Sequence, residues 1–107
     1  MVTESEFLRQ TDAVFAQLQS SLDASGVDVE AVLSGNVLDI ECADGSKIVV
    51  NRHVANRELW IAARSGGYHF AWRDGRWLDT RNAGEFFASL AVALSTQCGE
   101  TISLQSL

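Results

Sequence analysis

The sequence predicts an α+β fold, a two-layer α/β sandwich in which two helices cover one face of an antiparallel sheet. Apolar residues recur at helical spacing near both ends of the 107-residue chain and alternate at period two between those ends. Glycine, with Asn or Asp, separates the alternating segments. Because each expected helix has one apolar stripe, both can cover the same sheet face within a single domain, residues 1–107. The other sheet face is then open to solvent.

The first helix is expected over roughly residues 4–24. Thr3 followed by Glu6 fits a capping box, and Gly26 is a plausible terminator just past the end. The apolar stripe and one threonine within it recur at three- and four-residue steps: Phe7, Thr11, Val14, Phe15, Leu18 and Leu22.

Six short strands are expected to follow as an antiparallel meander. Their separators, such as Asp44-Gly45 and Asp74-Gly75, tolerate the positive φ of tight hairpins. The expected strands cover residues 27–33, 37–42, 47–52, 58–63, 68–72 and 76–79.

The second helix is expected to start near Asn82, with Glu85 three residues on as a capping-box-like pair, and to end at Gly99. Its apolar stripe consists of Phe86, Phe87, Leu90, Ala91 and Leu94.

The charge of the chain is unevenly distributed. The net charge of −6 argues against a nucleic-acid partner, since phosphate contacts need basic side chains. Residues 1–44 carry nine acids and one base, whereas residues 45–107 carry five acids and seven bases. The first part of the chain is therefore suited to meet cations or a basic partner. A solvated acidic face kept for solubility is the alternative.

The cysteines and the hydropathy indicate a cytoplasmic protein without a membrane segment. No apolar run approaches the roughly 20 residues that cross a bilayer, and the acidic start of the chain lacks the features of a signal peptide. Cys42 and Cys98 lie outside any CxxC, which suggests reduced thiols more than a disulfide. Cys42 shares the parity of the apolar residues Leu38 and Ile40 in its strand, so we expect a buried, inert thiol there rather than a nucleophile.

The open sheet face is expected to display an aromatic residue. If Leu59 and Ile61 meet the helices, Trp60 points to solvent, beside Asn51. An exposed Trp is typical of a binding hot spot. The alternatives are that flanking side chains half-bury Trp60, or that a bulge breaks the alternation.

Neither histidine has an HxxxH or HxH partner, and His69 is expected to be a surface sheet residue while His53 lies in a loop. The sequence contains no GxSxG, P-loop or GxGxxG pattern.

Taken in order, several segments resemble the frataxin family in its bacterial form. They are SEF at 5–7, NVLDI at 36–40, GSKIVVNR at 45–52, ELWIA at 58–62, SGGYHF at 65–70, GRW at 75–77 and the helix at 84–94. The resemblance covers essentially the whole chain. It implies the same sandwich fold. It also implies that the protein docks on cysteine desulfurase and the iron–sulfur scaffold protein and modulates the rate of cluster assembly.

The resemblance also implies weak iron binding, ferrous or ferric, on acidic residues of the first helix and first strand, with no tightly held cofactor. Asn51 and Trp60 match the sheet positions used for partner contact. Only these two positions are carried over from the family; if the chain is an adaptor, we expect Arg52, Arg57 and Arg64 to add contacts from the same side. The implied metal-binding positions are Glu4, Glu6, Asp12, Asp23, Asp28 and Glu30.

The chain departs from the family at the end of the first helix, where Gln19-Ser20-Ser21 stands in place of acids. Carboxylates two helical turns apart are also about 10 Å from one another, too far to share one ion. We therefore expect a loose site, an adaptor rather than an enzyme, and a monomer in which iron can drive oligomers. The alternative is an acidic surface that promotes Fe(II) oxidation, a ferroxidase activity.

Overall fold

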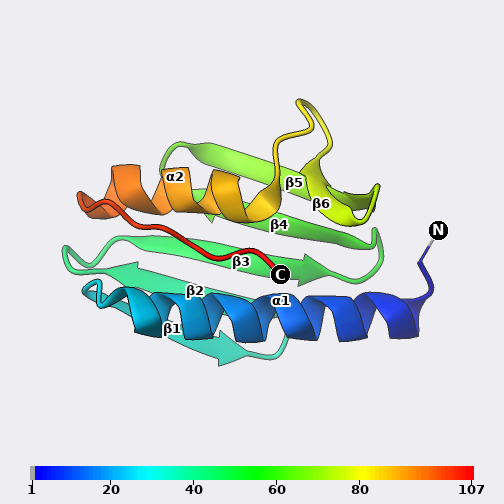
Figure 1. The fold of residues 1–107 in the computed structure, drawn as a ribbon, viewed down its shortest axis with the longest axis horizontal. Helices are drawn as coiled ribbons and strands as arrows, with labels where there is room; N and C mark the ends of the chain where they lie inside the picture. Colours follow the sequence, from blue (N-terminus) through cyan, green and yellow to red (C-terminus); the bar gives the residue numbers. More distant parts are fainter. Residues whose placement is uncertain (1) are drawn as a thin grey trace.

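The computed structural model describes residues 2–107 and confirms the predicted order of elements (Figure 1). Met1, the first residue of the predicted domain, lies outside the described residues. None of the helices in residues 2–107 is long and apolar enough to cross a membrane. The elements are α1 (Glu4–Ser25), β1 (Val29–Ser34), β2 (Val37–Cys42), β3 (Lys47–His53), β4 (Glu58–Ala63), β5 (Gly66–Arg73), β6 (Arg76–Asp79) and α2 (Phe86–Cys98).

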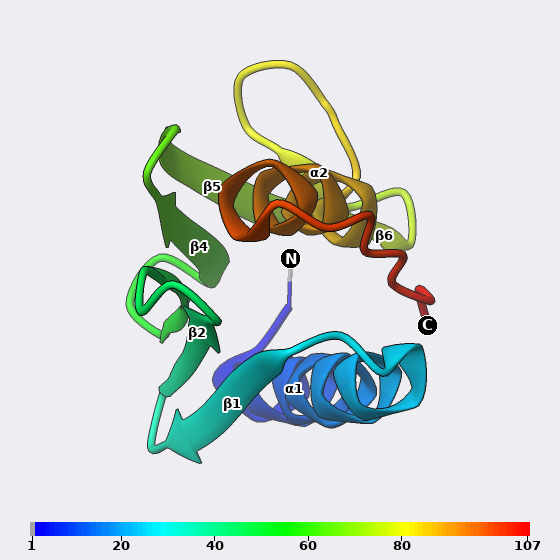
Figure 2. The ribbon, with the colours of Figure 1, turned by 90° about the vertical axis from the view of Figure 1, so that its left-hand side faces the viewer.

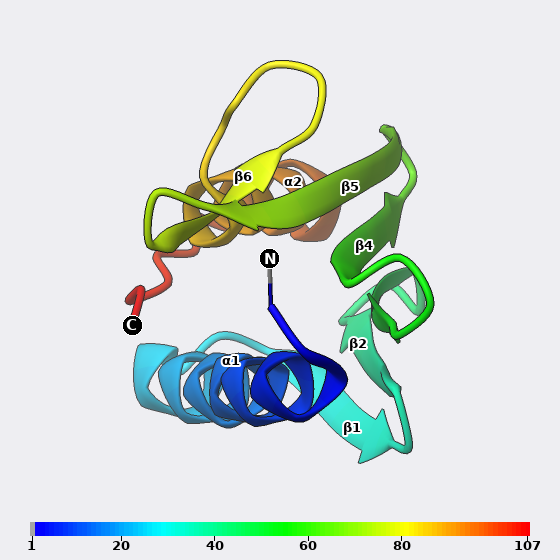
Figure 3. The same cartoon turned by 90° about the vertical axis from the view of Figure 1, so that its right-hand side faces the viewer.

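The strands form one antiparallel sheet in sequence order, β1 to β6. Both helices lie on the same face of this sheet, α1 beside β1 and α2 beside β5 and β6 (Figures 2 and 3). The two-layer sandwich with one open sheet face is therefore confirmed.

The core lies between the helices and the covered sheet face. The inward residues of the central strands are almost fully buried, as the alternation predicts. Phe70 of β5 packs edge-on against Phe86 of α2, with ring centroids 5.3 Å apart, and Phe7 of α1 packs in the same way on Trp77 at 5.8 Å. These aromatic pairs connect each helix to the β5–β6 half of the sheet.

The first helix begins and ends where its capping residues predict. The Thr3 hydroxyl accepts a hydrogen bond from the Glu6 amide at 3.2 Å, and the Glu6 carboxylate accepts from the Thr3 hydroxyl at 2.9 Å. Gly26 follows the helix in the left-handed conformation, with φ 70°, which glycine adopts at little cost.

The second helix starts four residues later than predicted. Asn82 lies in a loop, where its side-chain oxygen accepts from the Gly84 amide at 2.8 Å. The Asp79 amide donates to the Gly84 carbonyl at 2.7 Å, and a β-bridge between Leu78 and Glu85 holds Glu85 in an extended conformation after the turn. Glu85 is instead the N-cap and accepts from the amides of the first turn. Sequence spacing alone did not reveal this bridge.

The boundaries of three strands also shift. The first strand runs from Val29 to Ser34 rather than over residues 27–33, the third extends to His53, and the fifth runs from Gly66 to Arg73. His53 therefore lies at the end of a strand and not in a loop.

The two cysteines are joined in a disulfide, which corrects the expectation of reduced, inert thiols. Cys42 is buried at the end of β2, as predicted, and Cys98 is the last residue of α2. The residues are 56 positions apart in sequence, and only folding brings their Cα atoms to 5.2 Å. This separation within the chain is what made the pair look unrelated.

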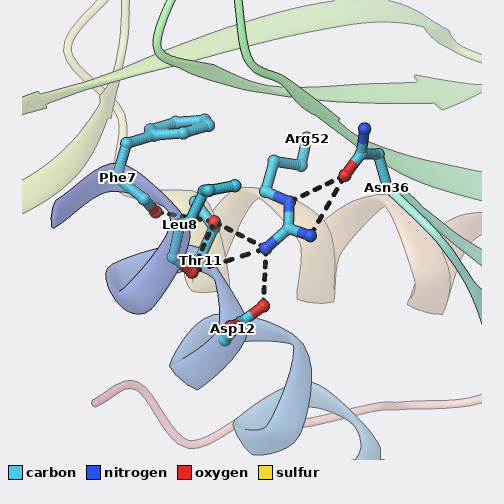
Figure 4. Close-up of polar contacts among 6 residues, drawn as sticks. All are labelled: Phe7, Leu8, Thr11, Asp12, Asn36 and Arg52. Atoms are coloured by element: carbon cyan, nitrogen blue, oxygen red, sulfur yellow. Dashed lines mark hydrogen bonds and ion pairs between the residues drawn. The ribbon is translucent and has the colours of Figure 1, made fainter. Parts of the chain in front are cut away.

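Arg52 of β3 connects the sheet to α1 (Figure 4). Its guanidinium donates to Asp12 at 2.6 Å, to the Thr11 hydroxyl at 3.2 Å and to the side chain of Asn36 at 3.0 and 3.1 Å. It also lies over the ring of Phe15, 5.4 Å from the centroid. Arg52 thus points into the helix layer, and the expectation that it adds contacts on the open face is wrong.

Replacing Arg52 is expected to weaken the attachment of α1. Arg52→Ala should lower the free energy of unfolding by about 2 kcal/mol, because it removes several hydrogen bonds from a side chain that is only 11% exposed. Asp12→Asn should cost less than about 1 kcal/mol, since the Asp12 side chain is 70% exposed. Urea unfolding measures both values.

Arg64→Ala, which breaks an exposed pair with Asp44 at 3.8 Å, is the control and should be nearly neutral. Equal losses for Arg52→Ala and Arg64→Ala would contradict the assignment.

Candidate functional site

The six predicted metal-binding carboxylates are all exposed, but the structure does not gather them into one site. They follow the length of α1 and continue through the loop into β1. Among residues 2–107, no group of three or more His, Cys, Asp or Glu side chains is placed to hold a metal ion. The arrangement therefore offers separate, solvent-accessible oxygen donors rather than a coordination cage.

The carboxylates in the first half of α1 already have partners within the protein. Asp12 pairs with Arg52 at 2.6 Å, and Glu4 lies 4.0 Å from Arg57. Glu6 completes the capping box with Thr3. A cation at these positions would have to compete with an internal hydrogen bond or ion pair, so they are poor ligands.

The remaining predicted carboxylates lie at the other end of α1 and on β1, the edge strand of the sheet. Asp23 is in the last turn of α1, and Asp28 immediately precedes β1. None of Asp23, Asp28 and Glu30 forms a salt bridge within the described part of the chain. Figure 2 shows this end of α1 beside β1.

The strand register adds a carboxylate that sequence reasoning had not included. Glu41 of β2 lies directly opposite Glu30 of β1 on the open sheet face. Like charges directly opposite one another destabilise a sheet and favour a cation between them. Lys47 follows on β3, opposite Glu41, and approaches Asp39 at 3.6 Å. We call Asp23, Asp28, Glu30 and Glu41 the acidic edge.

Asp44, in the turn after β2, has a lowered pKa. The hydroxyl of Ser46 donates to its carboxylate at 2.7 Å and the Ser46 amide at 2.9 Å, and both bonds favour the ionised form. The nearby Arg64 acts in the same direction. Asp44 therefore keeps its negative charge at lower pH than an ordinary aspartate, next to the strand that carries Glu41.

The open sheet face displays Trp60, as predicted, but the residue is half-buried rather than fully exposed. Its indole is stacked between two imidazoles, 4.0 Å from His53 and 4.2 Å from His69 between ring centroids, with interplanar angles of 10°. The alternation is not broken by a bulge, since Trp60 pairs in regular register with Asn51 and His69. Flanking side chains cover the indole, which is the alternative that the sequence left open.

The stack determines which part of Trp60 a partner can reach. Both faces of the indole are occupied, and its Nε1 donates to Glu58 at 2.7 Å. A partner would therefore meet the edges of three stacked rings, next to the half-buried Asn51. Sequence alternation placed Trp60 on this face, but it did not show that both histidines lie against it, because the three residues belong to three strands.

Comparison with known proteins extends these observations. A family model described as frataxin-like domain matches residues 1–100. The chain is 49% identical, over 107 residues and 100% of both sequences, to the iron-sulfur cluster assembly protein CyaY of Neisseria meningitidis. It is 46% identical over 103 residues to the protein of the same name in Paraburkholderia phymatum, which covers 96% of this chain and 98% of that protein.

Solved structures show the same architecture. The frataxin of Psychromonas ingrahamii superposes with a TM-score of 0.91 at 28% identity, over 98% of this chain and 100% of that one. Trimeric frataxin from Saccharomyces cerevisiae, in a ferrous complex, shares the fold with a TM-score of 0.69 at 20% identity, over 94% and 89% of the two chains. With the family model spanning nearly the whole length and relatives of almost half identical residues, the chain belongs to the frataxin-like family.

Proposed function

We propose that this protein is a non-enzymatic accessory protein of iron–sulfur cluster assembly, which binds iron weakly through surface carboxylates and docks on cysteine desulfurase and the scaffold protein. The observation that carries the proposal is the acidic edge, in which three exposed carboxylates and the half-buried Glu41 lie on a chain whose relatives are named as cluster assembly proteins. Iron, ferrous or ferric, is the cargo in this proposal and not a resident cofactor.

Within the six carboxylates of the original prediction, iron binding is best supported at Asp23, Asp28 and Glu30. These residues have no ion-pair partner in the described chain, whereas Glu4, Glu6 and Asp12 are engaged internally. Carboxylate oxygen is a hard donor that suits iron, but it suits magnesium and manganese as well. Exposed carboxylates contributing singly or in pairs leave most positions of an ion to water, so the affinity is low and falls with salt.

Docking on the desulfurase follows from the same charge. The acidic edge complements a basic surface on a partner, and such complementarity mainly raises the association rate. Because one set of side chains meets both iron and partner, the two are expected to influence each other. This is the behaviour of an iron-responsive adaptor.

Asn51 and Trp60 provide a second contact, for which the scaffold protein is the proposed partner. The ring edges of the His53–Trp60–His69 stack form a rigid, amphipathic surface at the centre of the open face. Aromatic anchors of this kind dominate many interfaces. Glu30 and Glu41 of the acidic edge lie on the same open sheet face as the stack, so both surfaces can be engaged together.

We place this role in the cytoplasm and propose a monomer that oligomerises when iron is abundant. The oligomer proposal is supported by the trimeric form of the yeast frataxin, whose fold this chain shares. A ferroxidase activity is the second candidate function. It is less favoured, because the described carboxylates form no preorganised metal site that would stabilise a transition state.

The acidic edge can be tested by charge neutralisation. Asp28→Asn/Glu30→Gln should weaken ferrous iron binding severalfold, because it removes two of the free ligands. Heteronuclear NMR titration of the labelled protein under anaerobic conditions measures this, and a second titration with cysteine desulfurase should show the same loss. Asp74→Asn/Glu100→Gln is the control with an identical charge change. It places Asn at a left-handed position, φ 53°, which Asn tolerates. If both double variants weakened iron binding equally, the effect would come from net charge alone, and the acidic edge would not be the binding site.

Trp60→Ala is expected to lower affinity for the scaffold protein about tenfold or more, as truncation of an aromatic hot spot does. It should also cost about 1–2 kcal/mol of stability, because the half-buried indole stacks on two rings. Calorimetric titration and urea unfolding separate the two effects. Val32→Ala is the control: Val32 lies on the same open sheet face as Trp60 but on the edge strand β1, and its replacement should leave scaffold affinity unchanged. An unchanged affinity in Trp60→Ala would remove the stack from the interface.

The ferroxidase alternative is decided by turnover. With protein far below the iron concentration, Fe(II) oxidation in air should match the rate in buffer alone, followed by the absorbance of a ferrous chelate. Several turnovers per protein molecule would overturn the non-enzymatic assignment.

A further inference from the structure

We propose that the Cys42–Cys98 disulfide is a redox-sensitive clamp that holds the end of α2 and the segment that follows it, and that a cellular thiol reductant opens it. The segment, residues 99–107, is called the C-terminal strap. It leaves α2 and passes between the two helices (Figure 1). Nothing in this inference depends on iron binding.

The disulfide is a covalent cross-link between side chains of the helix layer and the sheet. It joins the last residue of β2 to the last residue of α2. Next to it, Gln97 donates to the Lys47 carbonyl at 3.0 Å and accepts from the Arg64 amide at 2.9 Å. Both Gln97 contacts are exposed hydrogen bonds, so the disulfide is the stronger anchor at this end of α2.

Beyond the clamp, a few contacts hold the strap in place. The Ile102 amide donates to the Ser95 hydroxyl at 2.8 Å, and the Ile102 side chain is only 4% exposed. Farther along, the Gln105 amide donates to the Ser21 hydroxyl at 3.0 Å, and the Gln105 carbonyl accepts from Gln17 at 2.9 Å. The strap therefore connects α2 to the last turns of α1.

The strap is not tightly packed against α1. A cleft of about 420 Å³ lies between them, lined by hydroxyl, amide and methyl side chains without a charge. Only Ile102 and Leu104 of the strap pack in or against the core. Because a segment with few buried apolar contacts opens locally at low cost, its order depends on the anchor at its start. Cys98 immediately precedes the strap and provides this anchor.

The two sulfur-bearing residues differ in accessibility. Cys42 is 3% exposed, whereas Cys98 is half-buried at the exposed end of α2. A reductant thiolate would therefore attack the sulfur of Cys98. Cys42 leaves as a thiolate and takes a proton, and a mixed disulfide remains on Cys98.

A second reductant thiolate then attacks the reductant sulfur of the mixed disulfide. It releases Cys98 as a thiolate, which also takes a proton. Two electrons pass from the reductant, which becomes a disulfide, to the protein, which gains two thiols. Glutathione or a protein dithiol supplies these electrons.

The proposed compartment gives this chemistry a role. A reducing cytoplasm keeps most thiols reduced, and disulfides found there are mainly transient or redox-sensing. Opening the clamp frees the end of α2 and the strap, and with the strap it removes the bonds to Ser21 and Gln17 near the turn that carries Asp23. Oxidation thus rigidifies the end of α1 that enters the acidic edge.

The test equilibrates the full-length protein in a series of glutathione buffers from oxidising to reducing. Thiol alkylation and mass spectrometry measure the reduced fraction. We expect the protein to change from the disulfide to the dithiol form at a glutathione potential within this series. A disulfide that persists at the reducing end would be structural rather than switchable, and one that never forms at the oxidising end would be absent in solution; either result overturns the proposal.

Hydrogen exchange measured by NMR tests the structural consequence in the same samples. The amides of Ile102 and Gln105, both hydrogen-bonded in the clamped form, should exchange about tenfold faster or more after reduction, as expected for local release. Amides in β3 and β4 should change much less. Cys42→Ser/Cys98→Ser should reproduce the reduced pattern, and reduced wild-type protein replaces it if that variant does not fold.

Ile48→Val is the matched control, because it weakens the buried core and changes no residue of the clamp or the strap. It should raise exchange throughout the slowly exchanging core. A reduced protein with the same uniform pattern as Ile48→Val, or with no acceleration at Ile102 and Gln105, would show that the disulfide does not act on the strap.

Discussion

The burial of one face of a six-stranded sheet beneath two helices is the constraint on which the rest of the structure depends. Inward residues such as Ile40, Ile48 and Leu59 are removed from water only because both helices lie on their side. The same arrangement leaves the opposite face uncovered. It also directs the polar flank of α1 outward, where the carboxylates lie. The surfaces available to partners are therefore the open sheet face and the polar flank of α1, which the core does not use.

Ion pairing divides the acidic residues into two groups that composition does not distinguish. Arg52, brought under α1 by the inward parity of β3, neutralises Asp12 and connects helix, strand and the β1–β2 turn. The carboxylates near the end of α1 have no such partner, and the register sets Glu41 opposite Glu30. Negative charge is thus stabilising where it meets Arg52, whereas Asp23, Asp28 and Glu30 have no ion pair within residues 2–107, and a cation or basic partner gains most there.

The aromatic stack on the open face and the disulfide each join residues that are far apart in the sequence. His53, Trp60 and His69 come from three neighbouring strands and meet because antiparallel register sets them side by side. Cys42 and Cys98 meet because β2 and α2 end at the same side of the sandwich. One contact rigidifies an aromatic surface, and the other fixes the start of the C-terminal strap. The stack lies on the open face, away from the apolar core, whereas the disulfide lies at the margin of the core, where Cys42 is buried and Cys98 packs against the core.

Local signals in the sequence were sufficient for the architecture: the Thr3–Glu6 cap, the period-two strands and the turn glycines act over a few residues, and the fold agrees with them. The parity that exposed Trp60 was correct for the same reason. The late start of α2, the Asp12–Arg52 pair, the Trp60 stack and the disulfide were decided only by tertiary structure. Each of these four features joins residues that are distant in the sequence or lie on different elements. The strand register and the helix–sheet contacts that bring them together cannot be read from the spacing of neighbouring residues.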